Sequence, residues 1–193
     1  MKILVFDDMS QCTEQEVARL LPLVSAQRRE QALRYKHTLG QFCCLKSWLM
    51  VQEIMGNDAW RTKAWQYNEH GKPYLENGPY FSISHCKEGI AVAVDEQPIG
   101  IDIEGIRHAS ADLIERVLSE DERLKVKGEW DKDRAFTRLW TQKEAVVKME
   151  GTGIESFEQL QQVLLKSRDH ETTGLRKIET FESEKYIYSI AQK

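Results

Sequence analysis

The segment Ile99-Gly100-Ile101-Asp102-Ile103-Glu104 is the most informative stretch of the chain. Apolar residues alternate with other residues along it, as is typical of a β-strand with one buried face. Because successive side chains of a strand point to opposite faces, Gly100, Asp102 and Glu104 share the face that the isoleucines leave. Two carboxylates held side by side on a strand suit a hard cation, which prefers oxygen ligands. The segment alone leaves a second interpretation open, an edge strand with two solvated charges.

Composition places the chain among globular proteins with a substantial core. It has 193 residues, of which 41% are hydrophobic and 30% are charged, and this is enough apolar material to bury. The formal net charge of −4 argues against a general nucleic-acid binder. No apolar run reaches about 18 residues, so we expect no membrane-spanning segment. The four cysteines form no disulfide framework, and we therefore expect a cytoplasmic protein.

Helix and strand signals on both sides of the acidic segment indicate an α+β fold. The expected helices begin at capping serine or threonine residues or follow apolar stripes, and they cover 13–21, 25 to about 37 or 40, 42–56, a short stretch from 119, and 131–149. The expected strands cover 3–6, 62–67, 80–84, 89–94, 99–104 and a closing hairpin at 180–190. The short segment 156–166 has a helical pattern but stays undecided.

The order of these elements suggests a duplication. Helices are followed by a strand pair at 80–94 and again at 178–191, and Pro98 lies between the two sets. We therefore predict an N-terminal half of residues 1–98 and a C-terminal half of residues 99–193. Clefts between such halves are preferred ligand sites, and this division puts the acidic segment at the junction.

The expected helix at 131–149 holds a second group of chemically useful residues. Lys143 falls within its apolar stripe, which is unusual for a lysine. Glu144 and Lys148 are four residues apart and share a face, and the simple interpretation is an exposed ion pair that contributes about 0.2–0.5 kcal/mol. The functional interpretation makes Glu144 a third carboxylate near Asp102 and Glu104, with Lys148 holding an anion.

Other polar residues have two interpretations each. His85 follows a strand end without cysteine or histidine partners at zinc spacing, and it is either structural or a donor to a phosphate. Lys72 lies in a rigid turn and has the same two interpretations. An anion site or a solvated helix face would each explain a group of basic residues near the N-terminus, namely Arg28, Arg29, Arg34 and Lys46.

Four segments of the chain, taken together and in order, resemble the 4′-phosphopantetheinyl transferases, in particular the larger single-chain type that activates surfactin synthetase. The four segments are Gly71-Lys72-Pro73-Tyr74, Phe81-Ser82-Ile83-Ser84-His85, the acidic segment 99–104, and 140–148 followed by Gly151-Thr152-Gly153. The last two are specific as a pair, and the four together span about residues 71–153.

The resemblance implies a fold and a reaction. The fold is a pseudo-dimer of two similar α+β halves, monomeric, with coenzyme A bound between the halves. The reaction moves the 4′-phosphopantetheine arm of coenzyme A to a serine hydroxyl of an acyl or peptidyl carrier protein, and it releases adenosine 3′,5′-bisphosphate. An acidic helix of the carrier would meet a surface around residues 107–127, where basic and acidic residues are mixed.

The resemblance also implies roles for residues around the acidic segment. Mg²⁺ is implied at the carboxylates of Asp102, Glu104 and Glu144. The attacking serine needs a base, and Glu144 or a water on the metal is the candidate. Phosphate groups are implied next to Lys148 and His85.

Further residues are implied in binding coenzyme A. Lys72 and Ser84 match the nucleotide site, Glu122 matches an acid near the pantetheine phosphate, and Arg28 matches a cation for the 3′-phosphate. Cys43 and Cys44 occupy positions where the family commonly has a basic residue followed by a small polar one. Either Lys46 or another cation substitutes there, or the 3′-phosphate is held less firmly.

Two other functions use the same residues. A Mg²⁺-dependent enzyme of another kind, such as a pyrophosphate hydrolase acting on nucleotides, would need the acids but no carrier protein. A non-catalytic protein that binds coenzyme A or carrier proteins would have no use for Asp102, Glu104, Glu144 and Lys148 together.

Overall fold

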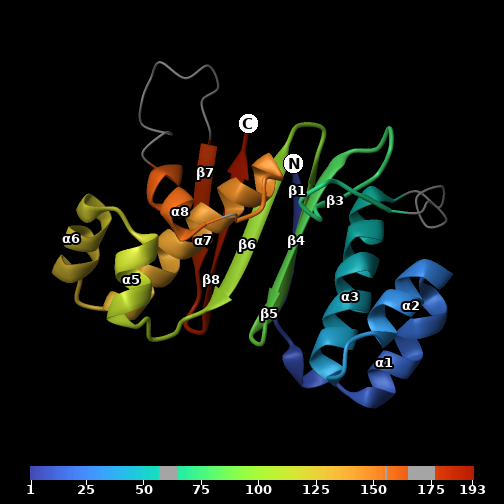
Figure 1. Ribbon diagram of the computed structural model, residues 1–193. Helices are drawn as coiled ribbons and strands as arrows, with labels where there is room; N and C mark the ends of the chain where they lie inside the picture. The colour runs from blue at the N-terminus through green and yellow to red at the C-terminus, as the bar shows by residue number, and fades with distance from the viewer. Residues whose placement is uncertain (57–64, 155, 165–176) are drawn as a thin grey trace.

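The computed structural model describes residues 1–56, 65–154, 156–164 and 177–193. The strands of the chain stand together in the middle of the molecule (Figure 1). Helices flank them on both sides, with α1 to α3 at one end and α5 to α8 at the other. Among the described residues, none of the helices combines the length and the apolar composition needed to cross a membrane.

The N-terminal part forms a three-stranded antiparallel sheet in the order β1-β5-β4. Its elements are β1 (Lys2–Phe6), the 3-10 turns Met9–Gln11 and Leu21–Leu23, α1 (Glu14–Leu20), α2 (Ala26–Leu33), α3 (Thr38–Met55), β2 (Gln66–Tyr67), β3 (Pro73–Tyr74), β4 (Tyr80–Cys86) and β5 (Gly89–Asp95). The short strands β2 and β3 pair separately with each other.

The C-terminal part forms a second three-stranded antiparallel sheet in the order β6-β8-β7. Its elements are β6 (Ile99–Gly105), α5 (Ala111–Val117), α6 (Glu120–Gly128), α7 (Lys132–Glu150), α8 (Phe157–Val163), β7 (Lys177–Glu182) and β8 (Tyr186–Gln192).

The two sheets have the same topology. In each, a leading strand (β1 or β6) precedes a long helix (α3 or α7) and a closing hairpin, and the leading strand pairs with the second strand of that hairpin. The expected α+β fold of two similar halves is therefore confirmed. The division of the chain at Pro98 stays a prediction.

Side chains of the central strand β5 alternate between two apolar clusters. On β5, Ile90, Val92 and Val94 belong to the core that contains α3, whereas Ala91 and Ala93 face the other way. The two alanines pack in a cluster that includes Ile99, Ile101, Ile103 and Ile190 from the other sheet. This apolar seam joins the two halves, because each sheet buries one face on its own helix and part of the other face on its partner sheet.

Most expected elements are present, with differences at their ends. The helix that begins after Ser25 stops at Leu33, and α3 begins at Thr38, so the expectation of one helix reaching His37 or Gly40 is wrong. Gly40 lies inside α3, where an added Cβ would come within 2.6 Å of the Tyr35 ring. The glycine thus makes room for the turn that separates the helices rather than ending one.

Two expected elements are described only in part. Of the strand expected at 62–67, residues 62–64 lie outside the described residues, and Gln66–Tyr67 is a short strand. Of the undecided segment 156–166, Phe157–Val163 is helical, and residues 165 and 166 lie outside the described residues.

Candidate functional site

The carboxylate of Asp102 is buried where β4, β6 and α7 meet. Its side chain is on the face of β6 opposite the seam isoleucines, and the residue is only 2% exposed. Gly100, on the same face, touches α7, since an added Cβ would come within 1.9 Å of the Ala145 carbonyl oxygen. The absence of a side chain at Gly100 therefore lets α7 lie directly against β6. The alternative of an edge strand with solvated charges is wrong for Asp102.

Two side chains from different elements meet at this carboxylate. Lys148 of α7 donates from Nζ to Asp102 Oδ1 at 2.6 Å and to Ser84 Oγ at 2.8 Å. Ser84 of β4 donates to the same Asp102 Oδ1 at 2.8 Å. The cluster joins the two halves, because β4 belongs to the first sheet, whereas β6 and α7 belong to the second part. The Lys148 side chain keeps 29% of its surface exposed, so its ammonium borders an accessible space.

Two further carboxylates stand next to this cluster. Burial and the negative charge of Asp102 raise the pKa of Glu104, although Arg107 opposes the shift. Burial and the Asp102 charge also raise the pKa of Glu144 to about 7, against the opposing charge of Lys148. These shifts mean that the three acids share one partly buried region, in which the charge of Asp102 makes ionisation of Glu104 and Glu144 less favourable. Lys148 does not form the simple exposed pair with Glu144, since its Nζ contacts Asp102.

The donor set fits a hard cation, although it is not gathered around one point. Oδ2 of Asp102 is buried and has no hydrogen-bond partner among the described residues, and an orphaned buried carboxylate oxygen suggests a ligand. The neighbouring Glu104 and Glu144 add oxygens of the kind that Mg²⁺ prefers. As the side chains stand, no three His, Cys, Asp or Glu residues within the described ranges are grouped closely enough to hold a metal ion.

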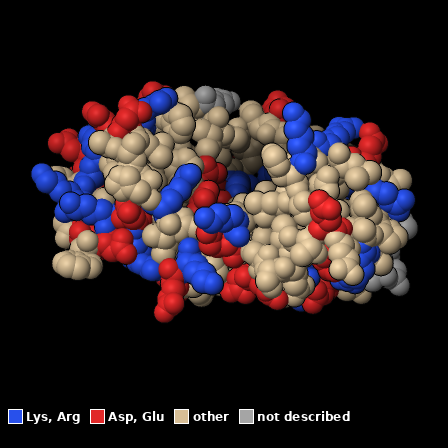
Figure 2. All heavy atoms as spheres, turned by 90° about the horizontal axis from the view of Figure 1, so that it is seen from below, with Lys and Arg blue, Asp and Glu red and all other residues tan. Residues whose placement is uncertain are grey.

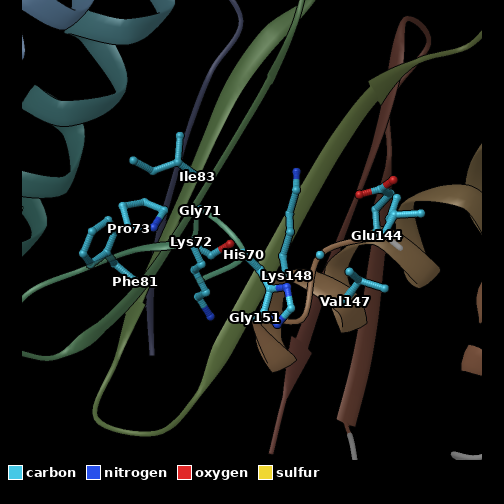
Figure 3. A pocket seen from close by; sticks show the side chains of 13 residues that line it. His70, Gly71, Lys72, Pro73, Phe81, Ile83, Glu144, Val147, Lys148 and Gly151 are labelled. Carbon is cyan, nitrogen blue, oxygen red and sulfur yellow. The ribbon is translucent and has the colours of Figure 1, made fainter. Parts of the chain in front are cut away.

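A cavity of about 350 Å³ opens beside Lys148 and Glu144. Figure 3 shows the Lys148, Glu144 and Val147 side chains extending from α7 on one side, and Gly71, Pro73 and Phe81 on the other. Its lining therefore comes from both parts of the chain: His70, Gly71, Lys72, Pro73, Phe81, Ser82, Ile83, Glu144, Val147, Lys148, Gly151, Gly153 and Ile154. Seen from below, the surface is hollowed between the two lobes, with basic and acidic side chains at the hollow (Figure 2).

His85 and Arg28 lie on the other side of β4. His85 is exposed at the end of the strand and has the opposite orientation to Ser84. Desolvation of its imidazole by the surrounding protein lowers its pKa, and the charges of Lys148 and Arg28 lower it further. Arg28 is 8% exposed. Its guanidinium donates to the Cys44 carbonyl oxygen at 2.9 Å and to Gln31 Oε1 at 2.9 Å, and it lies over the Trp65 ring at 4.3 Å.

The region around Cys43 and Cys44 does not gain a substitute cation from Lys46. The Lys46 ammonium is instead placed over an aromatic ring, with its Nζ 4.3 Å from the centre of the Phe6 ring. Cys43 is completely buried, and burial raises the pKa of its thiol to about 12, so this side chain is neutral. Arg28 therefore lies close enough to His85 for its charge to lower the pKa of the imidazole, whereas Lys46 contacts Phe6.

Glu122 lies apart from the cavity. It is buried, its capping box with Ser119 is complete, and it pairs with Lys143 Nζ at 2.9 Å. Lys143 also donates to the Leu160 carbonyl oxygen at 2.5 Å. The unusual lysine of the apolar stripe is thus half of a buried ion pair that connects α6, α7 and α8, and Glu122 is structural in this arrangement.

Two contributors were missed by sequence reasoning. Ser82 accepts a hydrogen bond from the Ile101 backbone N–H at 3.0 Å and ties β4 to β6. Asn68 donates to the Gly151 carbonyl oxygen at 2.8 Å, across 83 positions of the chain. The spacing of Ser82 and Ser84 on one strand face was an available signal for the first. The segment Asn68 to Pro73 predicted a turn, but nothing in it indicated that Asn68 would contact Gly151.

Comparison with known proteins agrees with this geometry. Residues 98–191 match the sequence model of the 4′-phosphopantetheinyl transferase superfamily. The chain is 32% identical over 149 residues to the 4′-phosphopantetheinyl transferase Ffp of Bacillus subtilis, covering 74% of this chain and 66% of that protein. It is 30% identical over 149 residues to Sfp of Bacillus subtilis strain 168, with the same coverage. It is 32% identical over 161 residues to Gsp of Aneurinibacillus migulanus, covering 78% and 66%.

The chain therefore belongs to the 4′-phosphopantetheinyl transferase superfamily. The relatives named above include Sfp and Gsp, in keeping with the Sfp-like type that its motifs indicated. The matched region spans about two thirds, 66%, of the length of these relatives.

Proposed function

We propose that this protein transfers the 4′-phosphopantetheine arm of coenzyme A to a serine hydroxyl of an apo acyl or peptidyl carrier protein. The observation that carries the proposal is the Asp102–Lys148–Ser84 cluster, which joins the two halves beside a cavity. Phosphoryl transfer depends mainly on positioning and charge neutralisation. The Lys148 ammonium, held by the Ser84 hydroxyl and the Asp102 carboxylate and next to two more acids, supplies both.

The reaction requires one bond to form and one to break. The serine oxygen of the carrier bonds to the phosphorus that bears pantetheine, and the bond from that phosphorus to the bridging oxygen of the pyrophosphate breaks. Adenosine 3′,5′-bisphosphate leaves with the bridging oxygen. Glu144 accepts the serine proton, and a carboxylate with a pKa of about 7 is well suited to this role.

The remaining residues bind the substrate or border it. Lys148 steadies the pyrophosphate, and its partly exposed ammonium supports this role. His85 and Ser84 contact phosphate groups from opposite faces of β4. Arg28 contributes positive charge to the 3′-phosphate, and Lys72 borders the nucleotide from the cavity wall.

Mg²⁺ is the proposed cofactor. Asp102, Glu104 and Glu144 would hold it, and the unpartnered Oδ2 of Asp102 supports this assignment. When bound, the ion would supply positive charge that neutralises the pyrophosphate. Burial and the charge of Asp102 raise the pKa values of Glu104 and Glu144 without it, so a divalent cation would remove an electrostatic cost that the protein otherwise bears.

We further propose that the protein acts as a monomer in the cytoplasm. The duplicated topology builds a site between two halves of one chain, and this makes a second copy unnecessary. All four cysteines are free thiols, which is compatible with a reducing compartment.

The test is incubation with coenzyme A, Mg²⁺ and a panel of apo carrier proteins, followed by intact mass measurement. We expect at least one carrier to gain one phosphopantetheine unit. Hydrolysis of coenzyme A without carrier modification would favour the pyrophosphate hydrolase instead. Binding of coenzyme A without turnover would favour the non-catalytic protein.

A further inference from the structure

The turn between β2 and β3 is built around the side chain of Asn68. Its Oδ1 accepts hydrogen bonds from the backbone N–H groups of His70 at 3.0 Å and Lys72 at 2.8 Å. The backbone closes the same turn, since the Asn68 N–H donates to the Lys72 carbonyl oxygen at 3.0 Å. Gly71 supplies the positive φ of 82° that the turn needs. The turn is therefore fixed internally, and its outward groups have defined directions.

The outward groups of this turn bind the C-terminal end of α7. Nδ2 of Asn68 donates to the Gly151 carbonyl oxygen at 2.8 Å. Nζ of Lys72 donates to the Met149 carbonyl oxygen at 3.1 Å and to the Ile99 carbonyl oxygen at 3.4 Å. The last carbonyls of a helix have no partner within the helix and carry partial negative charge. The lysine and the amide thus cap α7 from the opposite half of the molecule.

Packing at the cap leaves little space for movement. Gly151 ends α7 in the left-handed conformation, with φ of 73°. A Cβ on Gly151 would come within 3.0 Å of Lys72 Cδ and 3.1 Å of Asn68 Nδ2. The turn therefore rests directly on the helix end, and the residue just before Met149 is Lys148, which binds Asp102 and Ser84.

We propose that Asn68 and Lys72 are positioning residues, which fix the C-terminal end of α7 against the N-terminal half and so hold Lys148 and Glu144 at the cavity. This inference assigns the Lys72 ammonium to the helix end rather than to a phosphate. Burial of that ammonium lowers its pKa to about 8, in keeping with its location against carbonyl groups. The activity readout below rests on the proposed transferase function, whereas the exchange readout does not.

The test compares three variants of the full chain with the wild type. Asn68→Asp keeps the oxygen that braces the turn but replaces the donor facing Gly151 with an acceptor. Lys72→Met removes the ammonium and keeps an apolar stem, and Lys72→Arg restores a cation. The control is Gln161→Glu, which removes another side-chain amide donor to backbone carbonyls, those of Glu115 and Arg116 at 3.0 and 3.1 Å.

The first readout is amide hydrogen exchange of the peptide covering residues 147–153. The Gly151 N–H donates to the Val147 carbonyl oxygen at 2.8 Å, so its exchange reports the closed helix end. We expect Asn68→Asp and Lys72→Met to accelerate exchange roughly tenfold there and to leave β5 unchanged. The Gln161→Glu control should leave the peptide at the wild-type rate. Wild-type exchange in both turn variants would overturn the proposal, whatever the reaction of the protein is.

The second readout is steady-state kinetics with coenzyme A and a carrier protein. We expect kcat to fall about tenfold in Asn68→Asp and Lys72→Met, with KM for coenzyme A changed less than about threefold, and Lys72→Arg to recover part of the loss. A large rise in KM for Lys72→Met with unchanged kcat would overturn the proposal, because it would identify the ammonium as a phosphate ligand. Should no carrier react with the wild type, the exchange result still decides.

Discussion

Replacing Asp102 with asparagine is the most informative perturbation of the site. The substitution keeps the shape of the side chain and the contact with Ser84 but removes the charge that faces Lys148 at 2.6 Å. Asp102 is 2% exposed, so its neighbours rather than water respond to the change. The structure therefore predicts effects on both the stability and the activity.

The expected loss of stability follows from two opposing contributions. Removing one partner of a fully buried ion pair costs about 3–5 kcal/mol. The Lys148 side chain is 29% exposed, and water offsets part of that cost. The loss of the Asp102 charge also relieves Glu104 and Glu144, whose pKa values it raises. We expect Asp102→Asn to lower the free energy of unfolding by about 2 kcal/mol in metal-free buffer.

A double-mutant cycle with Lys148→Met measures the interaction directly. Urea unfolding of the wild type, both single variants and the double variant should give a coupling energy of about 2 kcal/mol. Transfer to the carrier should fall at least about a hundredfold in Asp102→Asn, because the variant removes charge from the phosphoryl-transfer site. A coupling energy below about 0.5 kcal/mol, or near-normal turnover, would refute the reasoning.

Three further predictions concern other parts of the molecule. The pKa of Glu144 is about 7 against an ordinary value of 4.5, so the folded state binds this proton more tightly than the unfolded chain does. In metal-free buffer this group should therefore lower the free energy of unfolding by about 3 kcal/mol as the pH rises from 4.5 to about 7. Urea midpoints of Glu144→Gln should show a flatter pH dependence than those of the wild type. Glu122→Gln leaves Lys143 buried without its charged partner. It should lower the free energy of unfolding, measured in urea, by about 3–5 kcal/mol, and an unchanged urea midpoint would contradict the buried pair. Gly100→Ala should lower the free energy of unfolding by about 4 kcal/mol or more, because the added Cβ clashes with the α7 backbone. The control Gly128→Ala, whose added Cβ meets nothing within 4 Å, should have the melting temperature of the wild type.

Local patterns predicted the fold and the main features of the site. Alternation along 99–104 correctly separated the seam isoleucines from the face that holds Asp102, because strand geometry fixes that alternation. The four-residue spacing correctly put Glu144 and Lys148 on one face of a helix. The position of Lys143 within an apolar stripe marked it as an unusual lysine, and the structure shows it completely buried.

Long-range packing accounts for what the sequence did not reveal. Nothing local to Lys148 indicates that its partners are Asp102 and Ser84, because that contact depends on α7 lying on β6 through the space at Gly100. The contact of Asn68 with Gly151 likewise joins segments far apart in the chain. Glu122 was matched to a phosphate site by motif, yet its own helix cap and its ion pair decide where it lies.

The central claim is that one site between the two halves loads a carrier serine with phosphopantetheine. The most direct test is intact mass measurement of an apo carrier protein and of its acceptor Ser→Ala variant, after incubation with this protein, coenzyme A and Mg²⁺. The account predicts one added phosphopantetheine unit on the carrier, none on the Ser→Ala variant, and one equivalent of adenosine 3′,5′-bisphosphate. Unmodified carriers across a broad panel, together with coenzyme A cleaved at the same rate without any carrier, would contradict it.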